Sequence, residues 1–237
     1  MVVKLNEVIP WGRSFDEYRR MFALTEEDLA GRILGCGDGP ASFNAEATAL
    51  GHAVVSCDPI YAFSPAEIER RVEECYGDLI AQVRRCPDEF VWDQFHDPDD
   101  LGQCRRAAMR RFLADFEAGK VESRYVSALL PDLPFEDGQF DLALISHLLF
   151  LYSEQLSFEF HRAAVEELLR VAREVRIFPL LTLERKRSPH VEAIRNDLAG
   201  RGWRTEIAVV PYEFQRGGNE VLRMSRKGRP PRLAPSE

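Results

Sequence analysis

The sequence predicts an α/β fold built on a mostly parallel sheet, because short apolar segments typical of strands alternate with segments typical of helices. The 237 residues fit one large domain with a modest insertion, and a hydrophobic content of 45% is enough for its core. Right-handed crossovers between parallel strands then bring the loops that follow the strands to one edge of the sheet, where ligands bind.

The individual elements are predicted from apolar periodicity and from the turn residues at their ends. The first strand, 33–34, ends in glycines, and the helix at 40–50 ends just before Gly51. Further strands are predicted at 53–57, 124–130, 140–145 and 175–181, a helix at 156–173, and a final antiparallel pair at 203–210 and 219–224. The last helix opens with Ser188 as its N-cap and Pro189 in its first turn, and Gly202 closes it.

An unusually long segment, 62–122, separates the second and third strands and predicts a helical insertion. Two groups of apolar residues have helical spacing: Ile68, Val72, Cys75, Leu79 and Val83, then Met109, Phe112, Leu113 and Phe116. The segment carries 14 acidic and 9 basic residues, and thus much of the net acidity of the chain. Two roles stay open for it: a lid over a binding site, or a structural packing unit.

The composition indicates an acidic chain that is expected to lie in the cytoplasm. A net charge of -8 and a sequence pI of about 5.3 argue against a nucleic-acid partner. No apolar run reaches the roughly 20 residues that cross a bilayer, and the N-terminus lacks a signal peptide, so no membrane partner is expected. Five cysteines without CxxC spacing predict free thiols and no metal site. The predicted domain is 1–225, followed by a disordered tail at 226–237, and the oligomeric state stays open.

A glycine-rich turn, Gly35-Cys36-Gly37-Asp38-Gly39, follows the first strand and suits a nucleotide-like ligand, because glycine allows close approach of the ligand and unusual φ angles. The dinucleotide pattern G-x-G-x-x-G does not fit, since its third glycine would fall at Pro40 or Ser42. Asp58 stands about 20 residues further on, where a carboxylate accepts hydrogen bonds from ribose hydroxyls. The alternative is a turn aspartate before Pro59.

The spacing Gly35-x-Gly37-x-Gly39 resembles the first motif of class I S-adenosylmethionine-dependent methyltransferases. The stretch at 133–142, Leu-Pro-Phe-Glu-Asp-Gly-Gln-Phe-Asp-Leu, closely resembles the one that leads into strand four of many small-molecule members, and 167–171 resembles the helix before strand five. The resemblance covers 33–224 and leaves the insertion unmatched.

This resemblance implies a Rossmann-like methyltransferase fold with a seven-stranded, mostly parallel sheet, an antiparallel last strand and helices on both faces. It implies S-adenosyl-L-methionine as cofactor and a small-molecule methyl acceptor. The implied cofactor-binding residues are Gly35, Cys36, Gly37, Gly39, Asp58, Pro59, Ala128, Leu129, Ser146, Arg13 and Tyr18.

The chain departs from the family pattern at two positions. Ile33 stands where many members have an acidic residue, and the region around Ala128 lacks the acid that contacts adenine. These gaps leave open a protein that binds S-adenosylmethionine without turnover. Methylation of RNA or protein is a further alternative, as is a nicotinamide-dependent oxidoreductase, which the glycine spacing disfavours.

Candidate chemistry centres on His147, which follows the fourth strand in an apolar, aromatic neighbourhood. It is predicted either as a catalytic base or acceptor-binding group, or as a structural histidine. In the resemblance, Arg13 meets the cofactor carboxylate and Tyr18 packs beside the cofactor, while the alternative for this region is an amphipathic helix packed on the sheet. An aromatic cluster in the insertion lines either an acceptor pocket or a helix junction: Phe90, Trp92, Phe95 and His96.

Overall fold

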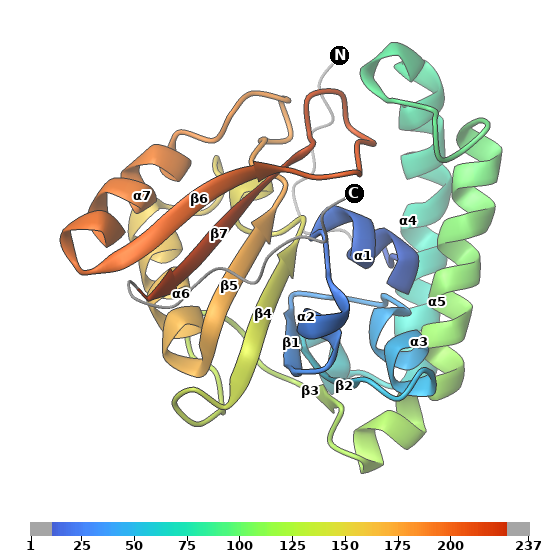
Figure 1. Cartoon of the computed structure of the whole chain (residues 1–237). Helices are drawn as coiled ribbons and strands as arrows, with labels where there is room; N and C mark the ends of the chain where they lie inside the picture. Colours follow the sequence, from blue (N-terminus) through green and yellow to red (C-terminus); the bar gives the residue numbers. More distant parts are fainter. Residues whose placement is uncertain (1–10, 227–237) are drawn as a thin grey trace.

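A seven-stranded sheet with the order β3-β2-β1-β4-β5-β7-β6 forms the centre of the computed structural model, which describes residues 11–226 (Figure 1). The strands are β1 (Arg32–Cys36), β2 (Ala53–Cys57), β3 (Tyr125–Val126), β4 (Phe140–Ser146), β5 (Ala172–Phe178), β6 (Trp203–Val209) and β7 (Glu220–Arg226). Neighbouring strands are parallel except where β7 runs antiparallel to β5 and to β6. The predicted seven-stranded, mostly parallel sheet with an antiparallel last strand is therefore confirmed.

Helices cover both faces of the sheet, as predicted. They are α1 (Phe15–Met21), α2 (Glu26–Leu29), α3 (Phe43–Ala49), α4 (Pro65–Arg85), α5 (Pro98–Val121), α6 (Phe158–Val171) and α7 (His190–Gly200), with short 3-10 helices η1 (Pro59–Ala62), η2 (Pro87–Glu89) and η3 (Phe150–Tyr152). Along β4, Ala143 and Ile145 face the cluster that contains α6 and α7, whereas Leu142 and Leu144 face the cluster that contains α1 and α3. Successive side chains of β4 therefore alternate between the two hydrophobic clusters, one on each face of the sheet.

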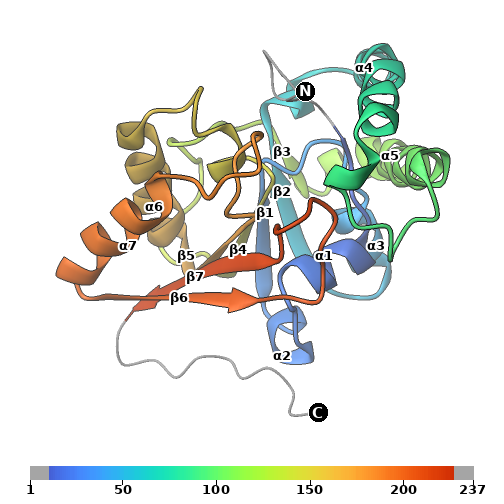
Figure 2. The same cartoon turned by 90° about the horizontal axis from the view of Figure 1, so that it is seen from above.

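The insertion is an antiparallel pair of long helices, α4 and α5, that lies on the opposite side of the molecule from α6 and α7 (Figure 2). Serine and aspartate caps begin both helices: Ser64 forms a capping box with Glu67, and the Asp97 side chain accepts backbone N–H bonds at the start of α5. The two predicted apolar faces are buried, with the exception of Cys75 and Leu113, which are half-buried at the edges of these faces.

Several predicted boundaries were wrong for identifiable reasons. The strand expected at 124–130 ends at Val126, and the chain then turns back through a bridge between Leu129 and Asp132. The helix expected at 40–50 begins only at Phe43, because the preceding residues form the edge of the glycine loop. The strand expected at 175–181 covers 172–178 instead and stops before Pro179, which has no N–H to donate to a neighbour.

The last helix also begins later than predicted. It starts at His190, and Ser188 lies outside it, where its hydroxyl accepts a hydrogen bond from the His190 backbone N–H. The tail expected at 226–237 lies outside the described residues except for Arg226, which ends β7. In the described part of the chain, no helix combines the length and the apolarity that a membrane span requires.

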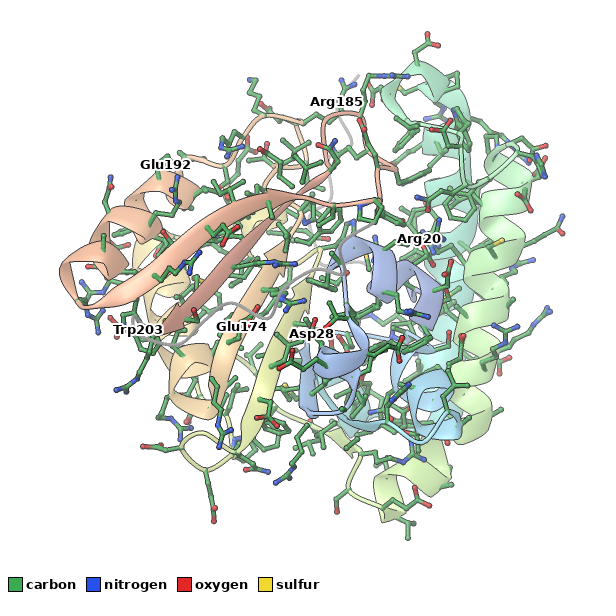
Figure 3. The ribbon with its side chains drawn as sticks, in the orientation of Figure 1. Arg20, Asp28, Glu174, Arg185, Glu192 and Trp203 are labelled. Atoms are coloured by element: carbon green, nitrogen blue, oxygen red, sulfur yellow. The ribbon has the colours of Figure 1, made fainter. Side chains whose placement is uncertain are left out.

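A buried arginine joins the N-terminal region to the sheet. The Arg176 guanidinium donates two hydrogen bonds of 2.9 Å to the Asp28 carboxylate and one of 2.6 Å to Glu174. Figure 3 labels the two acids, which come from α2 and β5. Arg176 and Asp28 are almost completely buried, so this charge network depends on mutual neutralisation.

Candidate functional site

A cavity of about 380 Å³ opens at the carboxyl ends of β1, β2 and β4. One wall is formed by the segment before α1, the glycine loop and the turns after β2 and β4. The opposite wall comes from α4 and from the loops around residues 89, 184 and 214. The insertion therefore lies over the edge of the sheet where ligand loops were predicted and also packs into the core, so both roles considered for it stay open.

The glycine loop forms the floor of this cavity. Gly37 and Gly39 have φ angles of +71° and +55°, a region that strongly favours glycine. A Cβ atom at Gly37 would also lie 2.5 Å from a terminal methyl group of Leu148, which would have to shift, so the φ angle is the main reason for glycine at this position. The loop is held to β2 by a 2.8 Å hydrogen bond from the Gly37 N–H to the Cys57 carbonyl.

Asp58 has the turn role that was considered for it, and its role toward a ribose stays a prediction. Its Oδ2 accepts the Gly39 N–H and its Oδ1 accepts the Ile60 N–H, each at 2.9 Å, so it fixes the loop and begins η1. It also lines the cavity, and burial raises the pKa of its carboxyl. Each oxygen keeps a lone pair beyond the bond that it accepts, which leaves capacity for a ligand hydroxyl.

Asp38 is a second cavity carboxyl, and the sequence prediction missed it. Its oxygens accept hydrogen bonds from the Tyr18 hydroxyl at 2.7 Å and the Ser56 hydroxyl at 2.6 Å. Burial raises the pKa of Asp38 to about 7, against the lowering effect of these two hydrogen bonds, and nearby Asp58 raises it further. The available signal is an acidic residue inside the glycine loop, at a position that the G-x-G-x-G pattern leaves variable.

The segment before α1 crosses the glycine loop and brings Arg13 and Tyr18 to the cavity. The Arg13 carbonyl accepts a 3.0 Å hydrogen bond from the Ser42 N–H. The Arg13 side chain is half-buried, its Nε is fully covered without a hydrogen-bond partner, and burial together with Arg105 lowers its pKa. The helix itself packs its apolar face on the sheet, which confirms the packing interpretation, while contact of Arg13 and Tyr18 with a cofactor stays a prediction.

Gly12 makes the backbone crossing possible, and its replacement by alanine is expected to lower the free energy of unfolding by about 1–3 kcal/mol. A Cβ atom there would lie 2.0 Å from the backbone oxygen of Pro40, so one of the two segments must move. Chemical denaturation measures the loss. Gly77→Ala, in α4 with open space around its Cβ position, is the matched control and should leave stability unchanged or raise it. Equal losses in both variants would contradict the crossing argument.

His147 lies at the cavity wall in a conformation that is uncommon for a residue with a side chain. Its φ angle is +53°, its N–H donates to the Phe178 carbonyl at 2.7 Å, and its Nδ1 lies 2.9 Å from the Ser146 hydroxyl. Burial lowers the pKa of His147 well below 6.5, and the positive charges of Arg13 and Arg105 lower it further. The imidazole is therefore neutral at pH 7, and such strained, charge-perturbed positions are enriched at functional sites.

The predicted aromatic cluster of the insertion is divided between the cavity and a junction. Phe90 lines the cavity and stacks on Phe214 at 4.7 Å between ring centroids. Trp92 and Phe95 pack edge-on against the same Phe214 ring, while His96 is exposed and contributes to neither. Within this cluster only Phe90 lines the cavity, and the acceptor-pocket interpretation stays a prediction for that residue.

The tip of the insertion is tied to the loops of the sheet above the cavity. Glu89 and Arg185, both in the cavity lining, form an ion pair at 2.8 Å. Arg185 lies at the upper edge of the molecule in Figure 3. In addition, the Val91 N–H donates to the Phe214 carbonyl at 2.8 Å. These contacts join the insertion to the loops of the sheet beside the cavity.

A buried ion pair joins the segment before the glycine loop to the insertion. The Arg105 guanidinium of α5 donates to the Glu17 carboxylate of α1 at 2.6 Å, and Tyr212 donates to the same carboxylate at 2.9 Å. Burial opposes ionisation of Glu17, but Arg105 outweighs this effect and lowers the pKa of Glu17 to about 2. The side chains are 1% and 6% exposed for Arg105 and Glu17, so neither charge is solvated.

Three of the predicted cofactor residues lie outside the cavity lining. Gly35 is covered by the Asp38 carboxylate, Cys36 is buried in the core beneath the loop, and Ala128 packs partly buried against the core. The lining does include the other predicted residues: Gly37, Gly39, Asp58, Pro59, Leu129, Ser146, His147, Arg13 and Tyr18. Across residues 11–226, no three His, Cys, Asp or Glu side chains are grouped so that they could hold a metal ion.

Comparison with known proteins identifies one clear relative. The chain is 34% identical over 224 residues, 93% of its own length and 97% of the relative, to Uncharacterized protein MJ0045 of Methanocaldococcus jannaschii. No protein-family model matches the chain.

Two solved structures show weaker likenesses. One is a Methanococcus maripaludis protein provisionally described as an S-adenosyl-L-methionine-dependent methyltransferase (13% identity, 92% of this chain, 85% of that chain, TM-score 0.46). The other is a Thermotoga maritima methyltransferase of the same cofactor class (10% identity, 90% and 95% coverage, TM-score 0.40). At this level of similarity neither structure assigns a ligand to the present cavity.

Proposed function

The chain belongs to the same protein family as MJ0045 of Methanocaldococcus jannaschii, and we propose that it is an S-adenosylmethionine-dependent methyltransferase acting on a small-molecule acceptor. The observation that carries this proposal is the meeting of the glycine loop and Asp58 in one cavity. A G-x-G-x-G turn with positive φ at Gly37 and Gly39 lets a ligand approach the backbone, and a carboxylate beside it suits the two hydroxyls of a ribose.

The remaining cavity groups suit the other parts of this cofactor. Arg13 has a guanidinium in the cavity that forms no ion pair with a carboxylate of the described chain, so it is available for the carboxylate of the cofactor. Ile60, Phe63 and Leu129 provide apolar contacts for a purine ring in place of the missing acid near Ala128. When bound, S-adenosylmethionine supplies an activated methyl group, and the chain has to align the acceptor and exclude water.

The acceptor side of the cavity favours a small molecule. Its wall is mainly apolar and aromatic, with contributions from Leu79, Val83, Phe90 and Phe214. The ion pair of Glu89 with Arg185 ties the tip of the insertion to a loop on one side of the cavity. The net charge of -8 also disfavours a nucleic-acid substrate.

Cofactor binding is the decisive test. Isothermal titration calorimetry of the full chain should detect binding of S-adenosylmethionine and of its demethylated product, S-adenosylhomocysteine, and no binding of NAD. Absence of heat and of any thermal stabilisation with both methionine derivatives would refute the proposal. Binding of both without methyl transfer to any acceptor of a broad panel would instead favour the non-catalytic alternative.

His147 is proposed to contact the acceptor, and His147→Ala is expected to reduce methyl transfer by about 10²–10⁴-fold while cofactor affinity is retained. Because its pKa lies well below 6.5, the neutral imidazole accepts a proton or hydrogen bond without first losing a proton, and its contribution should persist from pH 8 to pH 6. Release of S-adenosylhomocysteine measures turnover. A fall in melting temperature that matches the loss of turnover would instead identify His147 as structural.

A further inference from the structure

Polar atoms without a hydrogen-bond partner are concentrated at the cavity. In residues 11–226, six side-chain nitrogen or oxygen atoms are covered from water and have no hydrogen-bond partner. Three of the six belong to residues that line the cavity: Trp11, Arg13 and Gln82. Because a covered polar atom without a partner costs stability, this concentration indicates a place where a ligand takes part in the hydrogen bonding.

Gln82 belongs to helix α4 of the insertion and not to the region of the glycine loop. Leu79, Gln82 and Val83 stand at positions i, i+3 and i+4 of this helix, which share one face, and all three line the cavity. The Gln82 Oε1 accepts no hydrogen bond within the described chain. Rotation of the amide can therefore turn this oxygen toward a ligand without breaking a hydrogen bond that the oxygen already accepts.

Aromatic rings adjoin this turn of α4. Val83 packs in the same hydrophobic cluster as Phe90 and Phe214, and both phenylalanines line the cavity. Their rings are stacked, with 4.7 Å between centroids and 23° between planes. Trp92 and Phe95, which are outside the cavity lining, pack edge-on against Phe214 and fix its orientation. Such a rigid pair of rings suits a planar ring of a ligand, because aromatic rings prefer offset-stacked or edge-to-face contacts.

Other polar groups near these rings already have partners within the chain. Glu89 immediately precedes Phe90, and its carboxylate is paired with Arg185 at 2.8 Å, so this acid is not available to bind a cationic ligand. The Gln215 Nε2 donates to the Thr182 carbonyl at 3.5 Å. Among the described residues that line the cavity from α4 and the insertion tip, none except Gln82 has a covered polar atom without a partner.

We propose that the methyl acceptor is a planar aromatic compound with an O–H or N–H group, whose ring packs on Phe90 and Phe214 and whose O–H or N–H donates to the Gln82 Oε1. This inference rests on the proposed function, since it concerns the acceptor of the same reaction. It uses residues that are not assigned to the cofactor. The insertion and the connection between β6 and β7 then determine which acceptor binds.

Three small probes separate the ring from the hydrogen-bond donor. 4-Methylphenol has both, 4-methylanisole has the ring without the donor, and 4-methylcyclohexanol has the donor without the aromatic ring. Their dissociation constants are measured by ligand-detected NMR with the full chain saturated with S-adenosylhomocysteine. 4-Methylphenol should bind about tenfold more tightly than 4-methylanisole and about fivefold more tightly than 4-methylcyclohexanol.

Gln82→Leu removes the amide and should lower the affinity for 4-methylphenol to that for 4-methylanisole. Affinity for S-adenosylhomocysteine should stay the same, and the melting temperature should not fall, because the Gln82 Oε1 has no partner to lose. Gln94→Leu is the matched control. The Gln94 Oε1 is also covered without a partner, but Gln94 is outside the cavity lining, so this variant should keep the preference for 4-methylphenol.

Phe90→Leu removes one of the two stacked rings and should lower the affinity for 4-methylphenol to that for 4-methylcyclohexanol. Phe135→Leu is the matched control for this change. The Phe135 ring is half-buried and packs on Phe140, outside the cavity lining, so its loss should leave the preference for the aromatic probe unchanged.

Equal binding of the three probes, or binding of none of them, by a chain that binds S-adenosylhomocysteine would overturn the inference and leave the proposed function intact. An unchanged preference for 4-methylphenol over 4-methylanisole in Gln82→Leu, or its loss in Gln94→Leu as well, would also overturn it. Failure of S-adenosylhomocysteine to bind the unmodified chain would overturn the proposed function and, with it, this inference.

Discussion

Replacing Arg105 by methionine is expected to lower the free energy of unfolding by about 3–5 kcal/mol, because it leaves the Glu17 carboxylate buried without its positive partner. The pair is almost inaccessible to water, and Arg105 also lies over the rings of Trp11 and Phe95. Urea denaturation at neutral pH measures the effect. A loss below about 1 kcal/mol, the range of surface pairs, would contradict the buried-charge argument.

Two further variants show how much of the stability loss in Arg105→Met comes from the unpaired charge and how much from lost packing. Arg106→Met, one residue along α5, breaks a partly exposed pair with Glu73 and should cost about 1 kcal/mol at most. The double variant Glu17→Met with Arg105→Met removes both charges and should recover much of the loss.

The same pair predicts acid sensitivity. The pKa of Glu17 is lowered to about 2 from an ordinary value of 4.5, so its contribution is complete above pH 4.5 and is lost as the pH falls toward 2.

Replacing Asp58 by alanine is expected to weaken cofactor binding by about 1–3 kcal/mol, which is roughly 5–150-fold in the dissociation constant. The loss has two sources: hydrogen bonds to the ligand hydroxyls disappear, and the N–H groups of Gly39 and Ile60 lose the carboxylate that orients them. Titration with S-adenosylhomocysteine measures the affinity.

Asp132→Ala is a suitable comparison for Asp58→Ala, because Asp132 is an exposed acid outside the cavity lining, and its replacement should leave binding unchanged. An affinity of Asp58→Ala within twofold of the unmodified chain would show that the carboxylate serves only the turn. Melting of the ligand-free variant shows how much of the effect comes from the loop.

The central sheet could be predicted because its signals are local. Apolar runs such as 140–145 and the glycines after 33–34 mark strands and turns within a few residues of sequence. The boundaries that were wrong, near Leu130 and Pro179, depend on where a strand loses its neighbour, which is decided by the rest of the sheet. Local propensity carries little information about that.

The site was harder to predict than the sheet, because its charged residues are in contact in space but far apart in sequence. Glu17 and Arg105 are 88 residues apart in sequence, and each alone is typical of a solvated helix face. Asp38 was overlooked because its importance comes from Ser56 and Tyr18 around it. Asp58 was found, since its distance from the glycine loop is itself a sequence pattern.

The stacked rings of Phe90 and Phe214 form a part of the cavity wall that is separate from the glycine loop. One ring comes from the insertion and the other from the connection between β6 and β7, and neither belongs to the parallel strands that shape the glycine loop. Lengthening, shortening or exchanging these two segments is expected to change the cavity wall around Phe90 and Phe214 and to leave the glycine loop unchanged. Under the proposed function, the choice of acceptor is thus expected to depend on these two segments, whereas cofactor binding is expected to depend on the glycine loop.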